Sequence, residues 1–381
     1  MPEVPPLVPG FAQGNTGAEL EPETGEEAPE TEEPGEDPDS PDHGRRRRIF
    51  KALTIVGIAM LAIVLALGGT VAYFAYKYDH NITRIPDVFA PAPGEHRPAL
   101  VPAATAAQNF ILVGTDSRAP AQTTGTGGDP NAISPIGQRS DTIMLVHLPA
   151  DGKSAYLISI PRDSWVPIPG YGSNKINAAL AFGGPRLLRQ TIEQLTGVRV
   201  DHYLEVDFTG FKGMTNAVGG VDINVPADSF DSASHLQWHA GPQHMDGTKA
   251  LLYVRQRYGL PGGDFDRIKH QHQFLAALLH RTNSGGLLSN PISLNHFLGA
   301  VTNAVSVDSG LSATKLVSLA RKLRGVGSGA HYYTVPVTGT GTVGDASVVF
   351  LDVAQDKALW TAVRSDRLGS YTLPPPKYGP G

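Results

Sequence analysis

Residues 139–163 read RSDTIMLVHLPADGKSAYLISIPRD, and this stretch decides the fold. Two apolar runs, Thr142 to Leu148 and Ser154 to Ile160, flank five residues that include Asp151-Gly152, which is typical of a β-hairpin. A shorter apolar run from Asn109 to Val113 predicts another strand upstream. The sequence therefore predicts a sheet built around an antiparallel pair.

Charged residues stand at the ends of these strands. In an antiparallel pair the start of one strand lies beside the end of the next, so Asp141 and Arg162 are expected at one edge of the sheet. If the strand from residue 109 pairs antiparallel with the strand from residue 142, Asp116 reaches that edge as well. Acidic pairs bind divalent cations, and arginines hold phosphate oxygens through paired hydrogen bonds. The pattern predicts a metal–phosphate site, with ordinary surface ion pairs as the alternative; its expected members are Asp116, Arg118, Arg139, Asp141 and Arg162.

A second group of arginines follows a predicted short helix. Asp246 can cap this helix, which we expect to end near Tyr253. Arg255 and Arg257 are two residues apart and share a face in extended chain, so they would point at one target. The loop 262–267 then opens another helix, whose N-terminus favours an anion. The alternative is a solvated charged stretch.

The N-terminal part differs in composition from the rest. Residues 1–44 hold thirteen Asp and Glu and no Lys or Arg, and they are rich in Pro, Glu and Gly. Such a segment buries too little apolar surface to fold, so we expect a disordered tail. Residues 79–381 hold 25 Lys and Arg against 23 Asp and Glu, so the net charge of −5 comes from the tail. The absence of cysteine excludes disulfides and thiolate sites.

A membrane span is expected directly after this tail. Residues 52–76 form a charge-free, mostly apolar run of 25 residues, about 37 Å long as a helix. Arg45 to Arg48 and Lys51 precede it, which predicts a cytoplasmic N-terminus and an outer C-terminal part. Tyr73, Tyr76 and Tyr78 would then lie in an interfacial aromatic belt. A cleaved signal peptide is the alternative, but the apolar run is long and no A-x-A site follows.

Three other patterns are set aside. Gly152-Lys153-Ser154 lacks the first glycine of a P-loop. The motif from Gly339 to Gly344 fits G-x-G-x-x-G between an expected strand, 332–337, and an expected helix, 347–363, but no second strand is predicted to follow. The basic run before the apolar segment is explained by membrane topology, and no helix-turn-helix is evident, so no nucleic acid partner is expected.

Eight short blocks of this sequence resemble the LytR-CpsA-Psr proteins, and they keep that family's order from residue 109 to residue 283. The blocks are 109–118, 139–142, 159–163, 175–178, 201–208, 218–222, 253–257 and 264–267 with Gln271. One departure is His270, where many members have arginine. The resemblance implies an α/β fold, a three-layer α/β/α sandwich with a mixed central sheet. It also implies transfer of anionic glycopolymers from a polyprenyl (pyro)phosphate carrier to peptidoglycan at the cell membrane.

The resemblance also assigns roles by position. Asp116 and Asp141 match the magnesium-binding aspartates, with manganese as the alternative ion. The residues expected at the pyrophosphate are Arg118, Arg139, Arg162, Lys175, Arg255, Arg257, Arg267 and Gln271. The residues expected in catalysis are Asp116, Asp141, Arg162 and Asp264, the last as a candidate base. Asp163 is either catalytic or an ion-pair partner of Arg162, and Lys175 with Asn177 either binds substrate or caps a helix.

The sequence thus predicts five segments and one reaction. The segments are a disordered acidic tail (1–44), a basic flank with the membrane helix (45–78), a Pro-rich spacer (79–105), a catalytic core (106–283) and a C-terminal part completing the same outer domain (284–381). The reaction is phosphoryl transfer without a covalent enzyme intermediate, assisted by the metal and the arginines. Two alternatives are a polyprenyl-pyrophosphate phosphatase, which uses water as the acceptor, and a non-catalytic lipid-binding regulator of the envelope.

Overall fold

The computed structural model describes residues 76–115 except Pro93, 140–284, 290–312 and 329–374, together with Tyr73 and six positions between 315 and 326. The expected acidic tail lies outside these residues, as does nearly all of the expected membrane span. Within the described part of the chain, no helix combines the length and the apolar character needed to cross a bilayer.

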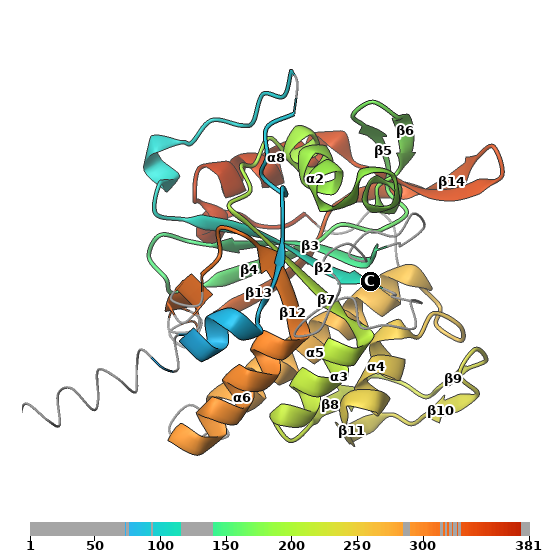
Figure 1. The fold of residues 1–381 in the computed structure, drawn as a ribbon. Coiled ribbons are helices and arrows are strands. Elements are labelled where there is room, and N and C mark those ends of the chain that lie inside the picture. Colours follow the sequence, from blue (N-terminus) through green and yellow to red (C-terminus); the bar gives the residue numbers. More distant parts are fainter. Residues whose placement is uncertain are drawn as a thin grey trace, which may run out of the picture. The chain divides into compact units, whose positions relative to one another are not determined.

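A mixed sheet of seven strands forms the centre of the fold (Figure 1). Its strands, in spatial order, are β1 (Thr83–Ile85), β12 (Val305–Asp308), β7 (His202–Asp207), β2 (Gln108–Thr115), β3 (Ser140–Leu148), β4 (Ala155–Ser159) and β13 (Ala330–Thr334). β3 pairs antiparallel with β4, as the sequence predicted. It also pairs antiparallel with β2, which is the condition on which Asp116 was expected at the same edge. β2 and β7 pair in parallel, which makes the sheet mixed.

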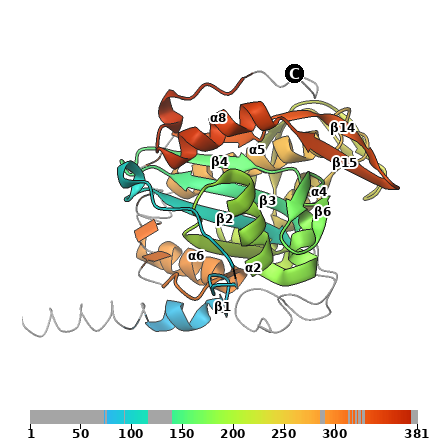
Figure 2. The same cartoon turned by 90° about the horizontal axis from the view of Figure 1, so that it is seen from above.

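One face of the sheet is tightly packed against helices α2 (Asn177–Thr196) and α8 (Val353–Arg364). Figure 2 shows these two helices lying over the strands. Side chains alternate along each strand, so Ile111, Leu145 and Ile158 all point to this face, and all are fully buried.

Four further helices belong to the other side of the sheet (Figure 1): α3 (Phe208–Ala217), α4 (Gly247–Arg255), α5 (Asp264–Ser284) and α6 (Pro291–Ala304). α3, α4 and α5 also share a second apolar core with two strands, β8 (Val221–Val225) and β11 (Gly241–Met245). The other short elements are η1 (Pro102–Ala104), β5 (Trp165–Ile168), β6 (Gly172–Lys175), β9 (Ser229–Asp231), β10 (Leu236–Trp238), β14 (Val337–Val343), β15 (Ala346–Leu351) and η2 (Leu368–Ser370).

The C-terminal part contains more strands than the sequence predicted. Residues 347–351, expected in a helix, belong to β15, which pairs with β14 in a hairpin that contains the glycine motif 339–344. The helix begins only at Val353, because the Asp352 side chain caps it by accepting from the backbone N–H of Gln355. The run Val348-Val349-Phe350 fits a strand as well as a helix. Asp352, as a helix-capping residue, was the sequence signal that the helix begins only after it.

The expected spacer, residues 79–105, is part of the folded unit. β1 pairs in parallel with β12, and further along the spacer Arg97 and Glu193 of α2 form an ion pair at 2.6 Å. Tyr78, expected in the interfacial belt, is buried, and its hydroxyl donates to the side-chain oxygen of Asn295 at 2.7 Å. These contacts fix the segment on the domain instead of leaving it extended.

Candidate active site

Three strands end, and one begins, at a single edge of the sheet. β2 ends at Thr115, and the register pairs this residue with Ser140, where β3 begins, and with Asp207, where β7 ends. β4 ends beside the same place, since Ser159 pairs with Met144 of β3. This geometry brings Asp141 and Arg162 together, as the sequence predicted, and the two side chains form an ion pair.

Asp264, the first residue of α5, contacts arginines from three segments. Its Oδ1 lies 2.9 Å from Nη2 of Arg267, 3.4 Å from Nε of Arg257 and 3.9 Å from Nε of Arg162. Arg267 in turn donates from Nη2 to the backbone oxygen of Asp141 at 3.2 Å. Asp264 therefore joins the residues around Arg162 to the loop that carries Arg257.

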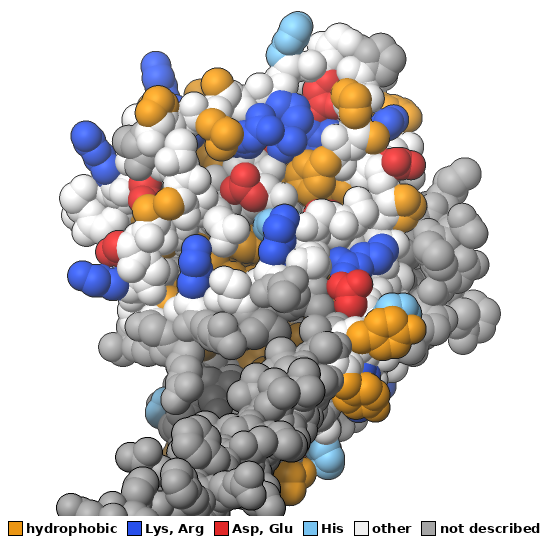
Figure 3. Space-filling model, turned by 60° about the vertical axis from the view of Figure 1, so that its left-hand side comes forward, with side chains coloured by type: hydrophobic (Ala, Val, Ile, Leu, Met, Phe, Trp, Pro, Cys, Tyr) orange, Lys and Arg blue, Asp and Glu red, His pale blue; other side chains and the backbone are white. Residues whose placement is uncertain are grey.

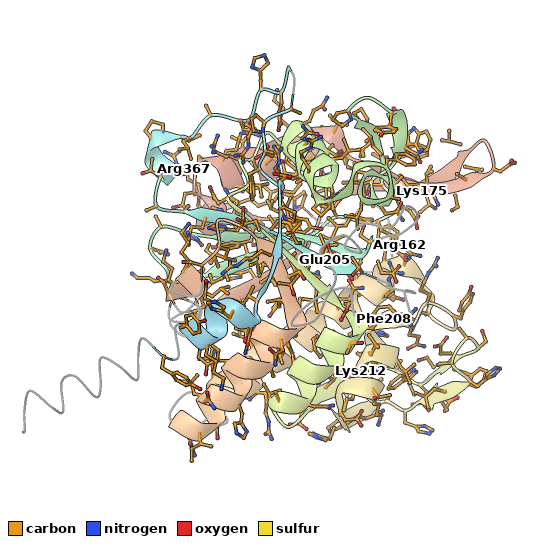
Figure 4. All side chains as sticks on the ribbon, viewed as in Figure 1. Arg162, Lys175, Glu205, Phe208, Lys212 and Arg367 are labelled. Atoms are coloured by element: carbon orange, nitrogen blue, oxygen red, sulfur yellow. The ribbon has the colours of Figure 1, made fainter. Side chains whose placement is uncertain are left out.

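The hairpin of β5 and β6 adds a lysine to this group. Lys175, the last residue of β6, has its Nζ 3.0 Å from Oδ1 of Asp163, and Oδ2 of Asp163 lies 3.7 Å from Nε of Arg162. Figure 4 shows Lys175 and Arg162 at this edge of the sheet. We call the connected set the charged cluster: Asp141, Arg162, Asp163, Lys175, Arg257, Asp264 and Arg267.

The charged cluster has unused capacity to bind an anion. It holds four cationic side chains and three carboxylates. The Nε atoms of Arg162 and Arg267 are buried and have no hydrogen-bond partner. Buried donors in proteins normally have a partner, so these two nitrogens are candidates to donate to a phosphate oxygen. The buried Oδ1 of Asp264, 3.9 Å from Nε of Arg162, also makes no hydrogen bond.

Arg267 is the most buried member of the charged cluster, with 4% of its side chain exposed. Burial lowers the pKa of its guanidinium to about 10, and the positive charges of Arg162 and Arg257 lower it further, against the opposing effect of Asp264 and Asp141. At neutral pH Arg267 still carries its charge. Arg267 is therefore a cation that its neighbours in the charged cluster hold in place and shield from water.

Arg255 and Gln271 lie beside the charged cluster, and their contacts differ from the prediction. Helix α4 continues to Arg255, two residues past the expected end, so Arg255 and Arg257 do not share an extended segment. The Arg255 guanidinium lies 4.2 Å from the ring centre of Phe208, while Arg257 faces Asp264. Gln271 donates to the backbone oxygen of Val254 at 3.5 Å, a contact that holds the end of α4.

The departure at position 270 has a structural explanation. His270 is buried and stacks on Tyr253 with ring centres 4.0 Å apart, and burial lowers its pKa. His272 instead contacts the hydroxyl of Ser159 through Nε2 at 2.8 Å, so the two histidines point apart as predicted. His270 is thus a packing residue between α5 and α4.

Asn177, the first residue of α2, is buried, and its backbone N–H donates to the carbonyl of Arg162 at 3.1 Å. This bond fixes the start of α2 against the segment that carries the charged cluster. Asp116, Arg118 and Arg139, all predicted at this edge, lie outside the described residues.

A divalent cation is compatible with the donor atoms at this edge. Asp141 offers the hard carboxylate oxygens that Mg²⁺ prefers, and Asp116, the predicted second ligand, follows directly after the last residue of β2. Among the described residues, no three His, Asp or Glu side chains gather to form a metal site. Mg²⁺ commonly binds through one or two carboxylates and the phosphates of its substrate, so a larger protein cage is not required.

Two residues next to this site were not predicted from the sequence. Phe208, at the start of α3, supports the Arg255 guanidinium. Glu205 is fully buried in β7 and accepts a hydrogen bond from the Tyr203 hydroxyl at 2.9 Å. Burial raises the pKa of Glu205 to about 7. The signal for Glu205 was a carboxylate on the same strand face as Tyr203, two residues apart.

The face of the molecule drawn in Figure 3 carries side chains of several kinds. Lys and Arg are interspersed there with Asp, Glu and hydrophobic side chains. The charged cluster is instead a connected group, positioned by the sheet edge, the β5–β6 hairpin and the start of α5. The fold and this cluster define a mixed α/β protein with a group of paired charged side chains at the edge of its sheet where β2, β4 and β7 end.

Comparison with known proteins gives the family. A sequence model of the LytR_cpsA_psr family matches residues 84–365, and the chain belongs to this family. LcpB of Corynebacterium glutamicum, a probable cell wall biosynthesis protein, is 36% identical over 329 residues, which are 85% of this chain and 75% of LcpB. The match to the family extends well beyond the core expected from the sequence, 106–283.

Two further relatives carry more specific names. TagU of Bacillus cereus, a polyisoprenyl-teichoic acid–peptidoglycan teichoic acid transferase, is 36% identical over 171 residues, 45% of this chain and 55% of TagU. The crystal structure of Bacillus subtilis TagV superposes with a TM-score of 0.56 at 26% identity, covering 70% of this chain and 98% of TagV.

Proposed function

We propose that this protein transfers a phosphate-linked glycopolymer from a polyprenyl-pyrophosphate carrier to a hydroxyl of peptidoglycan. The observation that carries the proposal is the charged cluster, in which the Nε atoms of Arg162 and Arg267 are buried without an acceptor. A pyrophosphate supplies such acceptors and the matching negative charge. The naming of TagU as a teichoic acid transferase supports the same class of reaction.

The opposite face of the sheet supports a lipid-linked substrate. Val146, Leu157 and Leu204 point toward the side of α3, α5 and α6, yet all three are only partly buried. Their neighbours on the α2 side are fully buried. Apolar side chains left partly open in the middle of a covered sheet are suited to an isoprenoid chain, whose burial there would be favourable.

In the proposed reaction, the hydroxyl oxygen of the acceptor attacks the phosphorus that bears the polymer. The bond from that phosphorus to the lipid phosphate oxygen breaks, and polyprenyl monophosphate leaves. Arg162, Arg257 and Arg267 would stabilise the negative charge that develops on the phosphate oxygens. Asp264 faces three arginines, which favours a role in positioning them, so we assign the hydroxyl proton to an oxygen of the departing phosphate.

The proposal includes a magnesium ion, with manganese as the alternative. Asp141 and Asp116 would hold it, and when bound it would neutralise charge on the pyrophosphate oxygens. The ion pair between Asp141 and Arg162 keeps both groups beside the position expected for the headgroup.

One assay tests the proposed function and separates it from the alternatives. The full-length protein in lipid nanodiscs is incubated with a labelled polyprenyl-pyrophosphate oligosaccharide, with and without peptidoglycan. We expect Mg²⁺-dependent movement of the label to peptidoglycan, and polyprenyl phosphate as the product. Release of soluble sugar phosphate at equal rates without peptidoglycan would identify a phosphatase instead. Tight lipid binding without turnover would identify a binding protein.

We also propose that residues 52–76 anchor the chain with its N-terminus in the cytoplasm and the catalytic domain outside. The support is the basic run Arg45 to Arg48 before the apolar segment. Protease added to intact protoplasts should remove the domain and spare a tag placed on residue 1. Loss of the tag with survival of the domain would reverse the orientation.

A further inference from the structure

Two exposed aromatic rings lie against each other on the β5–β6 hairpin and helix α2. Tyr171, in the turn between β5 and β6, stacks on Phe182 of α2 with ring centres 4.9 Å apart and an angle of 22° between the rings. Tyr171 is 53% exposed and Phe182 is 42% exposed. Large apolar rings are usually buried, so a fixed and exposed pair indicates a binding surface.

Local backbone features hold both rings at the surface. Gly170 and Gly172 have positive φ angles of 78° and 70°, which allow the tight turn that presents Tyr171. Phe182 is the last residue before a kink in α2, where Gly183 and Gly184 leave helical geometry. The Tyr171 hydroxyl donates to the backbone oxygen of Phe182 at 3.3 Å, so the pair is joined across the two segments.

The pair is connected to the charged cluster through the β5–β6 hairpin. Tyr171 precedes Lys175 by four residues of this hairpin, a span of about 13 Å in extended chain. Lys175 forms the ion pair with Asp163 described above. The rings therefore lie within the length of a few sugar units from the proposed reaction centre.

The segments that carry the pair hold few charged residues, and the exposed Arg186 follows on α2 four residues after Phe182. From Val166 to Pro185 the sequence holds one charged residue, Lys175, while Ser173 and Asn174 supply small polar groups. The two rings themselves offer no charge to an anionic polymer, whereas a neutral sugar chain can pack on them. Pyranose rings have apolar C–H faces that pack on aromatic rings, and their hydroxyls reach the polar groups at the rim.

We propose that Tyr171 and Phe182 form a platform on which the neutral glycan strand of the acceptor stacks, with a hydroxyl further along the strand at the charged cluster. This proposal rests on the proposed transfer function and names the site of its second substrate. It divides the substrates by charge: the arginines take the phosphate-linked donor, and the aromatic pair takes the uncharged sugar backbone.

Kinetics of the full-length protein in nanodiscs test the platform. For Tyr171→Ala and Phe182→Ala we expect the KM for soluble uncrosslinked glycan strands to rise about 3- to 10-fold, with kcat and the donor KM unchanged. Tyr171→Phe, which keeps the ring and loses the hydroxyl, should remain close to wild type. Phe230→Ala is the matched control, because Phe230 is an aromatic side chain 50% exposed on a different hairpin.

The outcomes separate a platform from a merely structural contact. An unchanged acceptor KM in both alanine variants would overturn the proposal, as would a rise confined to the donor KM, since that would mean the pair only positions Lys175. If the wild-type protein shows no transfer at all, the test is instead the binding of a chitin oligosaccharide, detected by saturation-transfer NMR. Loss of that binding in the alanine variants supports the platform without the transferase, and equal binding rejects it.

Discussion

Asp141→Ala is expected to slow glycopolymer transfer about 10²- to 10³-fold while leaving binding of the lipid-linked donor intact. The carboxylate would hold the magnesium ion, and its loss removes charge stabilisation that matters most in the transition state. Donor binding should survive, because the ion pair with Arg162 is released and frees that guanidinium for the headgroup. Single-turnover rates over a range of Mg²⁺ concentrations, together with donor binding measured separately, check both parts.

Arg367→Ala is a suitable control for Asp141→Ala. Arg367 is exposed and lies far from the labelled site residues in Figure 4. Its neighbour Asp366 contacts His147, which is close to the opposite end of β3 from Asp141. Wild-type, magnesium-dependent rates in a folded Asp141→Ala protein would show that Asp141 is structural, and the metal-assisted mechanism would have to be abandoned.

The sequence predicted the part of the site that follows from local pairing. Two apolar runs and the Asp-Gly turn between them specify the pairing of β3 with β4, and antiparallel geometry then places Asp141 beside Arg162. Neither step needs knowledge of distant contacts. Another local signal predicted the helix cap at Asp246, whose side chain accepts from the backbone N–H of Lys249 at 2.8 Å.

The remaining parts of the site depend on tertiary packing. Asp264 joins three arginines only because the start of α5 lies against the edge of the sheet, a placement that no periodicity encodes. The end of α4 was predicted two residues early because two arginines suggested extended chain. The structure instead continues the helix to Arg255, whose guanidinium packs over Phe208 on another helix. In the C-terminal part, short valine-rich runs fit both the helical and the strand periodicity. Which of the two forms depends on contacts with residues that are distant in sequence.

The second large effect is expected when Arg267 or Arg257 is replaced. Both arginines contact Asp264, but they differ in burial. Arg267 is 4% exposed and Arg257 is 44% exposed, and both contact Asp264. We expect Arg267→Ala to abolish measurable transfer and to lower the free energy of unfolding by about 3 kcal/mol. This is the lower end for breaking a buried pair, since Asp264 keeps Arg162 and Arg257 nearby. Arg257→Ala should cost less than about 1 kcal/mol of stability but still weaken donor binding.

A paired replacement separates the structural part of Arg267 from its chemical part. Arg267→Met combined with Asp264→Leu removes both charges of this pair, so neither is left buried without its partner. The double variant should therefore recover most of the stability that Arg267→Ala loses. Transfer should not return, because the apolar pair offers no donor to a phosphate oxygen. Arg267→Lys should also remain slow, since an ammonium cannot reproduce the planar set of guanidinium donors. Urea unfolding, donor binding and transfer are measured on the wild type, Arg267→Ala, the paired replacement and Arg267→Lys. If the paired replacement recovered transfer together with stability, Arg267 would act only in folding, and the pyrophosphate would have to be held by the other arginines.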